Sequence, residues 1–590
     1  MKKSHKRIAI IDRSLCLGAR CGYVCMKVCP GVKMGDKTVW IDNEGFPVIS
    51  EVLCTGCGIC PKKCPVDCID IINLPSETGT LIHQYGVNSF RLYNLPIPQA
   101  GVCGIIGKNG IGKSTAIKIM SGKLSPNFGN LSQNDEEKGL PPDLPLAIKN
   151  YFLDKRAKQL VVSYKPQNID KIPDVVSGKV NEILKRIDER GNFEDVVRRF
   201  SLQDILEREI KNLSGGELQR LALAASLLKD ADIYYFDEPS SYLDIEQRIA
   251  ISVAIREVGE TKNVMVVEHD LAVLDYLCDY VYIFWGHENG YGVVSSLKSA
   301  RRGINEYLSG VLRDENVRFR ENEIRFSFGS ESERKASVKL AYPQFQKKYP
   351  GFVFSSEAGE IMEGEIVGVV GKNALGKTLF AKLICGIEKP DEKYGDLPRV
   401  SLSYKPQYLS ADAKMTVSEF FSSQKLNAQF FEECKRRLGI ERLMLRKLTQ
   451  LSGGELQRVA ITSCLSKEAE LYLLDEPSAF LDIEQRLQFS ELIRSLIVNS
   501  SSSALVIDHD VVLIDSLASR IIVFDGRSSV YGHASSPQSK INGMNSFLKS
   551  MGITMRRDVD TLRPRINKPD SIMDRKQKEA GQYFYYKSKK

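Results

Sequence analysis

The sequence predicts a chain of several domains: two copies of one α/β domain in tandem, preceded by a small α+β domain that binds metal. Three observations support this prediction. The chain contains a long internal repeat, each copy carries a glycine-rich loop after an apolar strand, and nine of the 14 cysteines lie within the first 70 residues. At roughly 150 residues per domain, 590 residues allow three or four domains and several buried cores.

The overall composition excludes several classes of protein. With 43% hydrophobic and 26% charged residues, the chain is not collagen-like, disordered or a small disulfide-stapled fold. No apolar run approaches the ~18 residues that a membrane-spanning helix requires, and the first residues lack the apolar core of a signal peptide. We therefore expect a cytoplasmic protein with no membrane partner. The net charge is +8, and 561–590 concentrate the basic residues, with nine Lys or Arg against three Asp or Glu.

The first 82 residues form the predicted metal domain. Because cytoplasmic cysteines are kept reduced, their crowding favours metal ligation over disulfides. One run has the bacterial ferredoxin spacing C-x2-C-x2-C-x3-C-P, and the other is a widened counterpart that also ends in Cys-Pro. The runs are Cys54, Cys57, Cys60 and Cys64, and Cys16, Cys21, Cys25 and Cys29. The spacing therefore predicts a ferredoxin-like domain with two 4Fe-4S clusters.

The ligands of the two clusters are expected to cross over. In two-cluster ferredoxins the last cysteine of each run binds the other cluster, so Cys64 is assigned to the cluster of the first run and Cys29 to that of the second. Zinc is the competing metal, since paired cysteines also form zinc sites, but zinc sites do not need the Cys-Pro endings. Cys68 and the five downstream cysteines lack partners in the sequence and are interpreted as packed thiols.

The internal repeat divides the rest of the chain into two halves, 83–300 and 327–535. LSGGELQR occurs at 213–220 and 451–458, and YKPQ, DEPS and a histidine recur at offsets of 238 to 240 residues. The first copy has 24 extra residues between its glycine-rich loop and YKPQ. We expect these to form a surface helix-loop-helix at about 127–160, either as an idle loop expansion or as a partner contact.

Two charged segments flank the second half. Arg alternates with Asp and Glu in 301–326, and the final segment, 536–590, is basic with interleaved aromatic residues. We interpret them as connectors, hinge 1 and hinge 2. The alternative is a pair of solvated linkers, as charge runs usually are.

Each half carries the pattern of a phosphate loop. GKNGIGKS at 107–114 and GKNALGKT at 371–378 each follow an apolar strand. In such loops the backbone amides and the helix N-terminus bind phosphate, a lysine adds positive charge, and a hydroxyl group binds Mg²⁺. We therefore expect ATP and Mg²⁺ in both halves.

A pair of carboxylates follows a second buried strand in each half, at Asp237-Glu238 and Asp475-Glu476. The first carboxylate of each pair can reach Mg²⁺, and the second can orient or deprotonate the attacking water. The alternative is a salt-bridged acidic pair at a strand end, which the phosphate loops make the weaker interpretation.

With these motifs, the two halves resemble ATP-binding-cassette (ABC) nucleotide-binding domains. LSGGELQR matches the signature of that family, the glutamine of YKPQ its Q-loop, 241–244 and 479–482 its D-loop, and the repeated histidine its switch histidine. The resemblance implies two composite ATP-hydrolysing sites, each of which closes the phosphate loop of one half on the signature of the other. A Ser-Gly-Gly turn that opens a helix suits this role because it presents free amides to the γ-phosphate.

The implied site residues fall into two groups. The catalytic group consists of Glu238, Glu476, His269 and His509. The nucleotide- and magnesium-binding group consists of Gly107, Asn109, Gly110, Gly112, Lys113, Ser114, Thr115, Gln167, Ser214, Gly215, Gly216, Asp237, Gly371, Asn373, Gly376, Lys377, Thr378, Gln407, Ser452, Gly453, Gly454, Asp475, Tyr85 and Phe90.

Two parts of this assignment are less direct. Tyr85 and Phe90 fall where the family has an adenine-stacking loop, but aromatic residues near the start of a strand are equally compatible with core. Ala374 stands where the first copy has Gly110. Its β-carbon can shift the loop or restrict its backbone angles, so we expect the second site to differ in rate or affinity.

A two-cluster ferredoxin domain ahead of two cassettes resembles one family nearly end to end, the subfamily E cassette ATPases known as ribosome-recycling factor or RNase L inhibitor. LCTGCGIC at 53–60, NLPSETG at 73–79 and RPRIN at 563–567 carry this resemblance. It implies a monomer that binds the small ribosomal subunit and its RNA, beside a class I release factor or its rescue homologue. ATP-driven closure then swings the iron-sulfur domain and splits the ribosome after termination or stalling; initiation factors are a further implied partner.

Two other functions are compatible with the same motifs. The first is an ATP-gated electron carrier, whose clusters would have to cycle between redox states during turnover. The second is the detached ATPase pair of a transporter, which would need a coupling surface for membrane helices.

Overall fold

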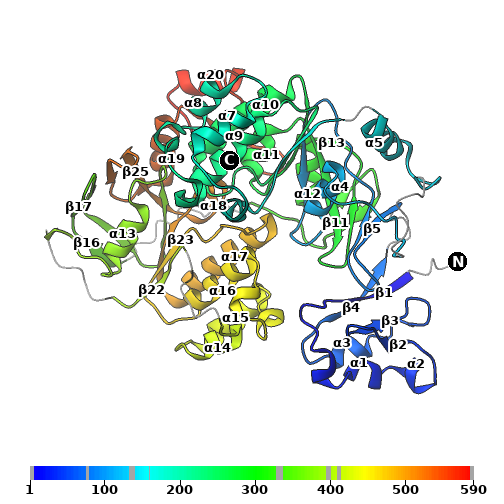
Figure 1. The fold of residues 1–590 in the computed structure, drawn as a ribbon. Coiled ribbons are helices and arrows are strands. Elements are labelled where there is room, and N and C mark those ends of the chain that lie inside the picture. The colour runs from blue at the N-terminus through cyan, green and yellow to red at the C-terminus, as the bar shows by residue number, and fades with distance from the viewer. Residues whose placement is uncertain are drawn as a thin grey trace.

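The computed structural model of the protein describes residues 6–74, 79–131, 140–157, 160–326, 337–393, 400–407, 409 and 414–584. Figure 1 shows a small N-terminal domain, in dark blue, below a larger first half in cyan and green. The second half, in yellow and orange, lies beside the first. Within the described ranges, no helix is both long enough and apolar enough to cross a membrane.

The N-terminal domain is built from two short antiparallel strand pairs, β1 with β4 and β2 with β3, and three one-turn helices. These elements are β1 Lys6–Ile11, β2 Val39–Ile41, β3 Pro47–Ile49, β4 Ile69–Leu74, α1 Val24–Lys27, α2 Pro30–Lys33 and α3 Ile59–Lys63. Because side chains alternate between the faces of a strand, β1 places Ala9 and Ile11 in a cysteine-rich core. Ile8 and Ile10 point the other way, into the larger core that includes the first half.

The first half combines a parallel sheet with a mixed sheet. Strands β8, β9 and β10 are parallel neighbours, and β7, the strand before the phosphate loop, pairs in parallel with β11. The strands are β5 Leu81–Gln84, β6 Arg91–Tyr93, β7 Gly101–Ile106, β8 Val162–Lys165, β9 Ile233–Asp237, β10 Asn263–Val267, β11 Tyr280–His287, β12 Tyr291–Val294 and β13 Lys298–Ser299. Every residue of β9 is buried, as expected for a parallel strand covered on both faces.

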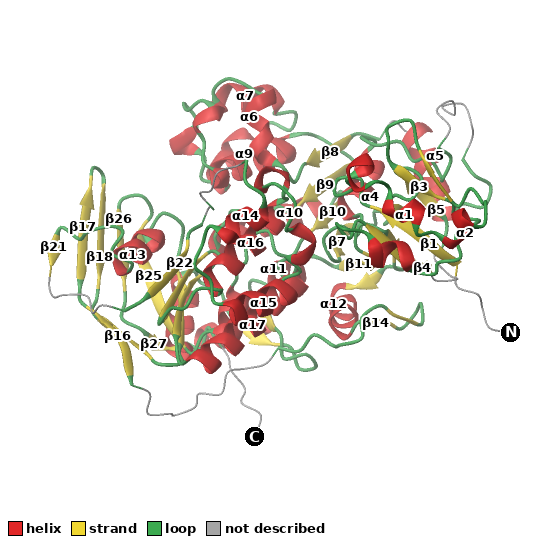
Figure 2. Ribbon diagram, turned by 90° about the horizontal axis from the view of Figure 1, so that it is seen from below, coloured by secondary structure: helices red, strands yellow, loops and turns green. Residues whose placement is uncertain are grey.

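Helices surround these strands in the first half. They are α4 Lys113–Ser121, α5 Leu146–Ala157, α6 Ile172–Val175, α7 Val180–Ile187, α8 Phe193–Arg199, α9 Gly215–Leu228, α10 Ile245–Gly259 and α11 Leu271–Leu277. Figure 2 shows α6, α7 and α9 close together in one helical group, in which α9 contacts β8 through a hydrogen bond from Ser163 Oγ to Ser226 O at 2.9 Å. Helix α5 lies within the insert expected at about 127–160, of which 132–139 and 158–159 lie outside the described residues.

The second half repeats this plan around one long sheet. Its parallel strands follow the order β25-β20-β24-β23-β22, with β26, β18, β17 and β21 beyond β25. The strands are β16 Val338–Tyr342, β17 Phe345–Tyr349, β18 Phe352–Ser356, β19 Gly359–Met362, β20 Ile366–Val370, β21 Glu392–Lys393, β22 Leu402–Lys405, β23 Leu471–Asp475, β24 Ser503–Ile507, β25 Arg520–Arg527, β26 Tyr531–Ala534 and β27 Gln538–Ser539. The helices are α13 Lys377–Ile384, α14 Val417–Ser422, α15 Ala428–Arg437, α16 Gly453–Leu465, α17 Ile483–Ser500 and α18 Val511–Leu517.

Both connecting segments are folded and packed, so the alternative of solvated linkers is wrong for their described residues. The first contains α12 Ala300–Ser309, β14 Val311–Leu312 and β15 Val317–Arg318, and the second contains α19 Lys540–Ser550, β28 Met555–Arg557, β29 Pro564–Ile566 and α20 Ile572–Glu579. Ile304 and Leu308 of α12 are buried, as are Met544 and Leu548 of α19. Strands β28 and β29 pair as an antiparallel hairpin, which we call the hinge hairpin.

Candidate nucleotide and metal sites

Both phosphate loops connect the carboxyl end of a parallel strand to a helix. Helix α4 begins after Gly112 and α13 after Gly376, with φ of 94° and 92° respectively, a backbone conformation that favours glycine. Lys113 Nζ donates hydrogen bonds to two carbonyl oxygens of its own loop at 2.8 and 2.6 Å, and Lys377 does the same at 2.9 and 2.6 Å. Burial lowers the pKa of each lysine to about 8.

Ala374 keeps the backbone conformation of its glycine counterpart. Its φ is 58° and that of Gly110 is 69°, both in the left-handed region. The same backbone bond forms in each half: Ser529 N donates to Ala374 O, and Asn289 N to Gly110 O, each at 3.0 Å. The β-carbon therefore leaves the turn intact, although the left-handed conformation costs an L-residue about 1–2 kcal/mol.

The strand-end aspartates are buried beside these loops. Asp237 and Asp475 are each 1% exposed. Both carboxylate oxygens of Asp237 and Oδ1 of Asp475 have no hydrogen-bond partner among the described residues, while Asp475 Oδ2 accepts a bond from Thr378 Oγ1 at 2.7 Å. Burial raises the pKa of both carboxyl groups. Buried carboxylates with free oxygens fit Mg²⁺, which prefers oxygen ligands.

Glu238 follows β9 with a φ of 49°, a strained conformation typical of functional positions. Its Oε1 accepts a hydrogen bond from Gln167 Nε2 at 2.6 Å, and its Oε2 accepts one from Ser241 Oγ at 3.1 Å. His269 Nε2 lies 3.6 Å from Oε1. Burial and the charge of Asp237 raise the pKa of Glu238, and burial together with nearby cations lowers the pKa of His269 well below its usual value.

Glu476 has the same position and backbone conformation in the second half, with a φ of 48°. His509 Nε2 lies 3.5 Å from its Oε1. Burial opposes ionisation of this carboxyl group, but contacts with His509, Gln407 and Lys377 outweigh it and lower the pKa to about 2. The pKa values of the two predicted catalytic glutamates are therefore shifted in opposite directions, although their sequence motifs are the same.

The signature motifs begin helices, as the resemblance implied. Ser452 caps α16: its Oγ accepts from Glu455 N at 3.4 Å, and Glu455 Oε2 accepts from Ser452 N at 2.8 Å. Ser214 caps α9 in the same reciprocal way. A β-carbon on Gly454 would lie 3.9 Å from Asn109 Nδ2. The signature of the second half thus faces the phosphate loop of the first.

The D-loop of the second half also reaches across to the first. Asp482 Oδ1 accepts a hydrogen bond from Gln485 N at 2.9 Å and so caps α17. Its Oδ2 accepts a bond from Asn109 N, in the phosphate loop of the first half, at 3.0 Å. Lys108 of that loop forms an ion pair with Glu484 at 2.8 Å.

The reciprocal contacts are present at the other site. Asp244 caps α10 through Gln247 N at 3.0 Å, and its Oδ2 accepts from Asn373 N at 2.8 Å. Lys372 pairs with Glu246 at 2.8 Å. Each phosphate loop is therefore held by the D-loop of the opposite half.

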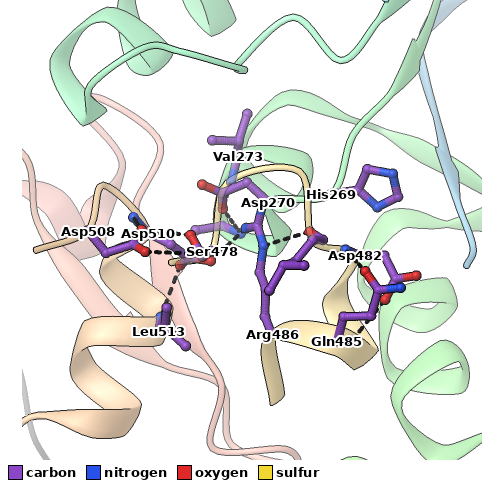
Figure 3. A network of polar contacts seen from close by, with 12 residues as sticks. His269, Asp270, Val273, Ser478, Asp482, Gln485, Arg486, Asp508, Asp510 and Leu513 are labelled. Carbon is purple, nitrogen blue, oxygen red and sulfur yellow. Dashed lines mark hydrogen bonds and ion pairs between the residues drawn. The ribbon is translucent and has the colours of Figure 1, made fainter. Parts of the chain in front are cut away.

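A further network ties the D-loop helices to the switch loops. Figure 3 shows Arg486 of α17 among loops of both halves. Its Nη1 donates to Asp510 Oδ2 at 2.6 Å, and Arg248 of α10 makes the equivalent bond to Asp270 at 2.7 Å. Asp270 and Asp510 each follow a switch histidine, so each arginine joins a D-loop helix to the switch loop of its own half.

Sequence reasoning missed several residues that support the acidic pairs. Lys165 and Lys405 of the YKPQ motifs are buried, and each donates two hydrogen bonds, at 2.7 to 3.2 Å, to the carbonyl oxygens of the neighbouring Asp-Glu pair. Gln219 and Gln457 of the signature helices donate to carbonyls of the same strand ends. These lysines and glutamines occupy the same positions in both halves, and this repetition could have marked them as functional in the sequence.

The hinge hairpin contacts both halves through buried ion pairs, which sequence reasoning also missed. Arg565 binds both oxygens of Asp275, on α11 of the first half, at 2.5 and 3.1 Å. Arg557 binds both oxygens of Asp515, on α18 of the second half, at 2.8 and 3.0 Å. Arg563, with no exposed surface, lies 3.6 Å from Asp275. The two aspartates occupy equivalent positions of the repeat, six residues after each switch histidine.

The aromatic residues at the start of the first half lie in different environments. Tyr85 is 53% exposed, and its hydroxyl lies 3.1 Å from Thr115 Oγ1. Phe90 packs against the phosphate loop, where a β-carbon on Gly112 would approach its ring to 2.6 Å. Tyr85 is thus exposed beside the helix that follows the phosphate loop, whereas Phe90 packs against the loop itself; stacking of a base on either residue stays a prediction.

The two cysteine runs fold in the same way. Cys25 lies in α1 and Cys60 in α3, and both helices follow a residue in the left-handed conformation. Cys29 and Cys64, which precede the two prolines, have identical backbone angles, φ −69° and ψ 122°. All 14 cysteines are free.

A pocket lies between the cysteines of this domain. It is lined by apolar residues and by five cysteines: Cys16, Cys21, Cys25, Cys64 and Cys68. The first four are the crossed ligand set expected for one cluster, and a thiol-lined cavity fits iron-sulfur chemistry. In the described ranges no three His, Cys, Asp or Glu side chains are grouped as ligands of a single ion. The interpretation of Cys68 as merely a packed thiol is incomplete, because its Sγ lies 3.5 Å from that of Cys64.

The N-terminal domain is attached to both halves. Asn88, at the start of the first half, is 2% exposed and hydrogen-bonds to backbone groups of β1 and β3 at 2.8 to 3.0 Å. Arg91 pairs with Glu51 of the domain. Asp70 lies 3.3 Å from Arg442 of the second half.

Comparisons with known proteins agree with this architecture. The family described as "ABC transporter" matches residues 90–241 and 357–479, and "Possible Fer4-like domain in RNase L inhibitor, RLI" matches 7–37. The chain is 42% identical to ABC transporter E family member 1 of Arabidopsis thaliana, covering 98% of each chain.

Two solved structures are similar. ABCE1 in the structure titled "Model of ribosome-bound archaeal Pelota and ABCE1" is 46% identical, with a TM-score of 0.90 over 98% of this chain and 99% of that one. The archaeal ribosome recycling factor aABCE1, solved in complex with the ribosomal stalk protein aP1, is 46% identical, with a TM-score of 0.79 over 87% of this chain and 100% of that one. The predicted fold class, two tandem ABC domains after a Fer4-like domain, is confirmed, and the chain belongs to the E family of ABC proteins.

Proposed function

We propose that this protein is an ATP-driven ribosome-recycling factor that splits ribosomes into subunits after termination or stalling. It acts with a class I release factor or its rescue homologue, remains on the small subunit through contacts with ribosomal RNA, and has a further role with initiation factors. The similarity to ribosome-bound ABCE1 and to an archaeal ribosome recycling factor supports this proposal. We further propose that it works in the cytoplasm as a monomer.

The observation that carries the proposal is the reciprocal contact between the halves. Each phosphate loop is bonded to the opposite D-loop, and the N-terminal domain is tied to the first half by a buried asparagine and to the second by an exposed ion pair. Movement of one half relative to the other would therefore strain or break the Asp70–Arg442 contact and displace the N-terminal domain. In this proposal, ATP closes the halves and the domain transmits the motion to the ribosome.

The residues of each site would divide the chemistry of hydrolysis. The loop amides and Lys113 or Lys377 hold the phosphates, and Glu238 or Glu476 orients the attacking water and accepts its proton. His269 and His509 lie near these carboxylates and would contact the γ-phosphate. Mg²⁺, when bound, would neutralise phosphate charge between the strand-end aspartate and the loop hydroxyl of each half.

The proposed metal content is two 4Fe-4S clusters with crossed ligands. One is held by Cys16, Cys21, Cys25 and Cys64, and the other by Cys54, Cys57, Cys60 and Cys29. In a recycling factor they stabilise a domain too small to form a large core of its own. An ATP-gated electron carrier or a detached transporter ATPase is less favoured, because two similar structures are of proteins bound to a ribosome or to a ribosomal stalk protein.

A ribosome-splitting assay tests the proposal. Purified ribosomes are mixed with the protein, ATP and a release or rescue factor, and separated on sucrose gradients. We expect conversion of whole ribosomes to subunits with ATP, and none with the Glu238→Gln/Glu476→Gln variant. Ribosomes that remain undivided under every nucleotide and factor condition would refute the function.

A further inference from the structure

Cys68 shares a cavity with a complete set of cluster ligands. One pocket of the N-terminal domain is lined by Cys68 together with the four cysteines assigned to one cluster. Cys68 is 4% exposed. Because four cysteines complete the ligation of a 4Fe-4S cluster, Cys68 is a fifth thiol at a site that needs four.

The position of Cys68 is fixed relative to Cys64. The two sulfur atoms lie 3.5 Å apart, within hydrogen-bond distance for sulfur. The carbonyl oxygen of Cys68 accepts a hydrogen bond from Asp12 N at 2.8 Å, and β4 begins at the next residue. The backbone is therefore held at the wall of the pocket, and the Cys68 thiol lies directly beside that of Cys64.

The equivalent position in the other run has no such thiol. Cys29 has the same backbone angles as Cys64 and also precedes a proline. Four residues after Cys29, however, the chain carries Lys33, which is exposed. The pseudo-symmetry of the domain thus provides an internal comparison for the role of Cys68.

We propose that Cys68 is a reserve ligand of the cluster bound by Cys16, Cys21, Cys25 and Cys64; this inference rests on the cluster assignment made above. In the resting site the Cys68 thiol donates a hydrogen bond to the Cys64 sulfur. In an exchange, the iron–sulfur bond to Cys64 breaks and a bond to Cys68 forms. The proton of Cys68 passes to Cys64, so that no electron is gained or lost. When Cys64 is removed by mutation, Cys68 takes its place as the fourth ligand beside Cys16, Cys21 and Cys25, and its proton passes to solvent.

Removal of each last cysteine tests the proposal in the full-length chain. Wild type, Cys64→Ala, Cys68→Ala, Cys64→Ala/Cys68→Ala and Cys29→Ala are purified and reconstituted without oxygen. Iron and acid-labile sulfide are then counted, and electron paramagnetic resonance distinguishes three-iron from reduced four-iron clusters. We expect about eight iron atoms per chain in wild type, Cys68→Ala and Cys64→Ala, and the loss of one four-iron cluster in the double variant and in Cys29→Ala.

Nucleotide binding to each variant shows whether the two halves remain folded. The proposal is overturned if Cys64→Ala loses a cluster to the same extent as the double variant, or if Cys29→Ala retains both. Cys64→Ser/Cys68→Ser repeats the comparison with a smaller change in side-chain shape. A wild-type chain without four-iron clusters would overturn the cluster assignment itself, whereas failed ribosome splitting with intact clusters would refute the proposed function and leave this inference standing.

Discussion

Replacing Asp482 with asparagine should weaken the contact between the two halves without unfolding either one. Asparagine keeps an oxygen that can accept from Gln485 N and cap α17. The other position then carries an NH₂ group, which cannot accept the bond that Asn109 N donates at 3.0 Å. The change therefore removes one charge-assisted hydrogen bond between the halves.

The size of the effect follows from that single bond. A hydrogen bond to a charged group contributes about 1.5–3 kcal/mol, which corresponds to a roughly 10- to 150-fold shift of the equilibrium away from the closed arrangement. Asp244→Asn should produce a similar shift through Asn373. Because the two bonds share no partner, the double variant should lose approximately the sum of the two free energies.

Closure is measured by energy transfer between fluorophores on unnatural amino acids at Val175 and Ile387, which are exposed on opposite halves. The background is the slow Glu238→Gln/Glu476→Gln variant, in which the closed form accumulates with ATP. Asp525→Asn, at an exposed carboxylate of β25, is the matched control. An ATP titration midpoint that is the same for all three aspartate variants would refute the reasoning.

Three other predictions follow from the charges at the sites. Glu238→Gln and Glu476→Gln should each slow hydrolysis at the altered site by about 10²- to 10⁴-fold. Because burial raises the pKa of Glu238 while the pKa of Glu476 is lowered to about 2, acidification should inactivate the Glu476→Gln enzyme, which relies on Glu238, at a higher pH than the Glu238→Gln enzyme. Coincident pH–rate profiles of the two variants would contradict this. Lys113 and Lys377 have pKa values of about 8 in the free protein and are charged below that pH, so ATP affinity should weaken about tenfold between pH 7 and 9, with proton uptake on binding. Calorimetry in buffers of different ionisation enthalpy measures both the affinity and the proton uptake. A constant affinity without proton uptake would disprove the prediction. Asp275→Asn removes the carboxylate that pairs with Arg563 and Arg565 and should destabilise the hinge hairpin by about 3–5 kcal/mol. The measurement is urea-induced loss of hydrogen-exchange protection in the hairpin, which should occur at lower urea, and unchanged protection would argue against the ion pairs.

The motifs that bind phosphate could be predicted because their requirements are local. A left-handed glycine must precede the loop helix at Gly112, and Ser452 must be followed by an acidic residue at the third helical position to form its capping box. These requirements appear in the sequence as fixed residues at fixed spacing. The cysteine runs could be predicted from the sequence for the same reason, because their cysteines and prolines also stand at fixed spacing.

Other features depend on contacts between distant segments. Arg565 and Asp275 are 290 residues apart, and nothing in the surrounding sequence marks them as a pair. Cys68 belongs to no spacing motif, so its place beside Cys64 required the fold. The difference in pKa between Glu238 and Glu476 arises from side-chain distances, because the motifs of the two halves are the same.

The hinge hairpin gives the two halves a second attachment. The chain passes from the first half to the second through the segment that contains α12. After the second half, the hinge hairpin binds α11 of the first half and α18 of the second through its arginines. A cut in the first connection would therefore leave the halves tethered, at an effective concentration far above that of free domains. Two separate attachments also leave the halves fewer ways to move relative to each other than a single connection would. Such a restriction would turn nucleotide-driven approach of the halves into a stroke of defined direction.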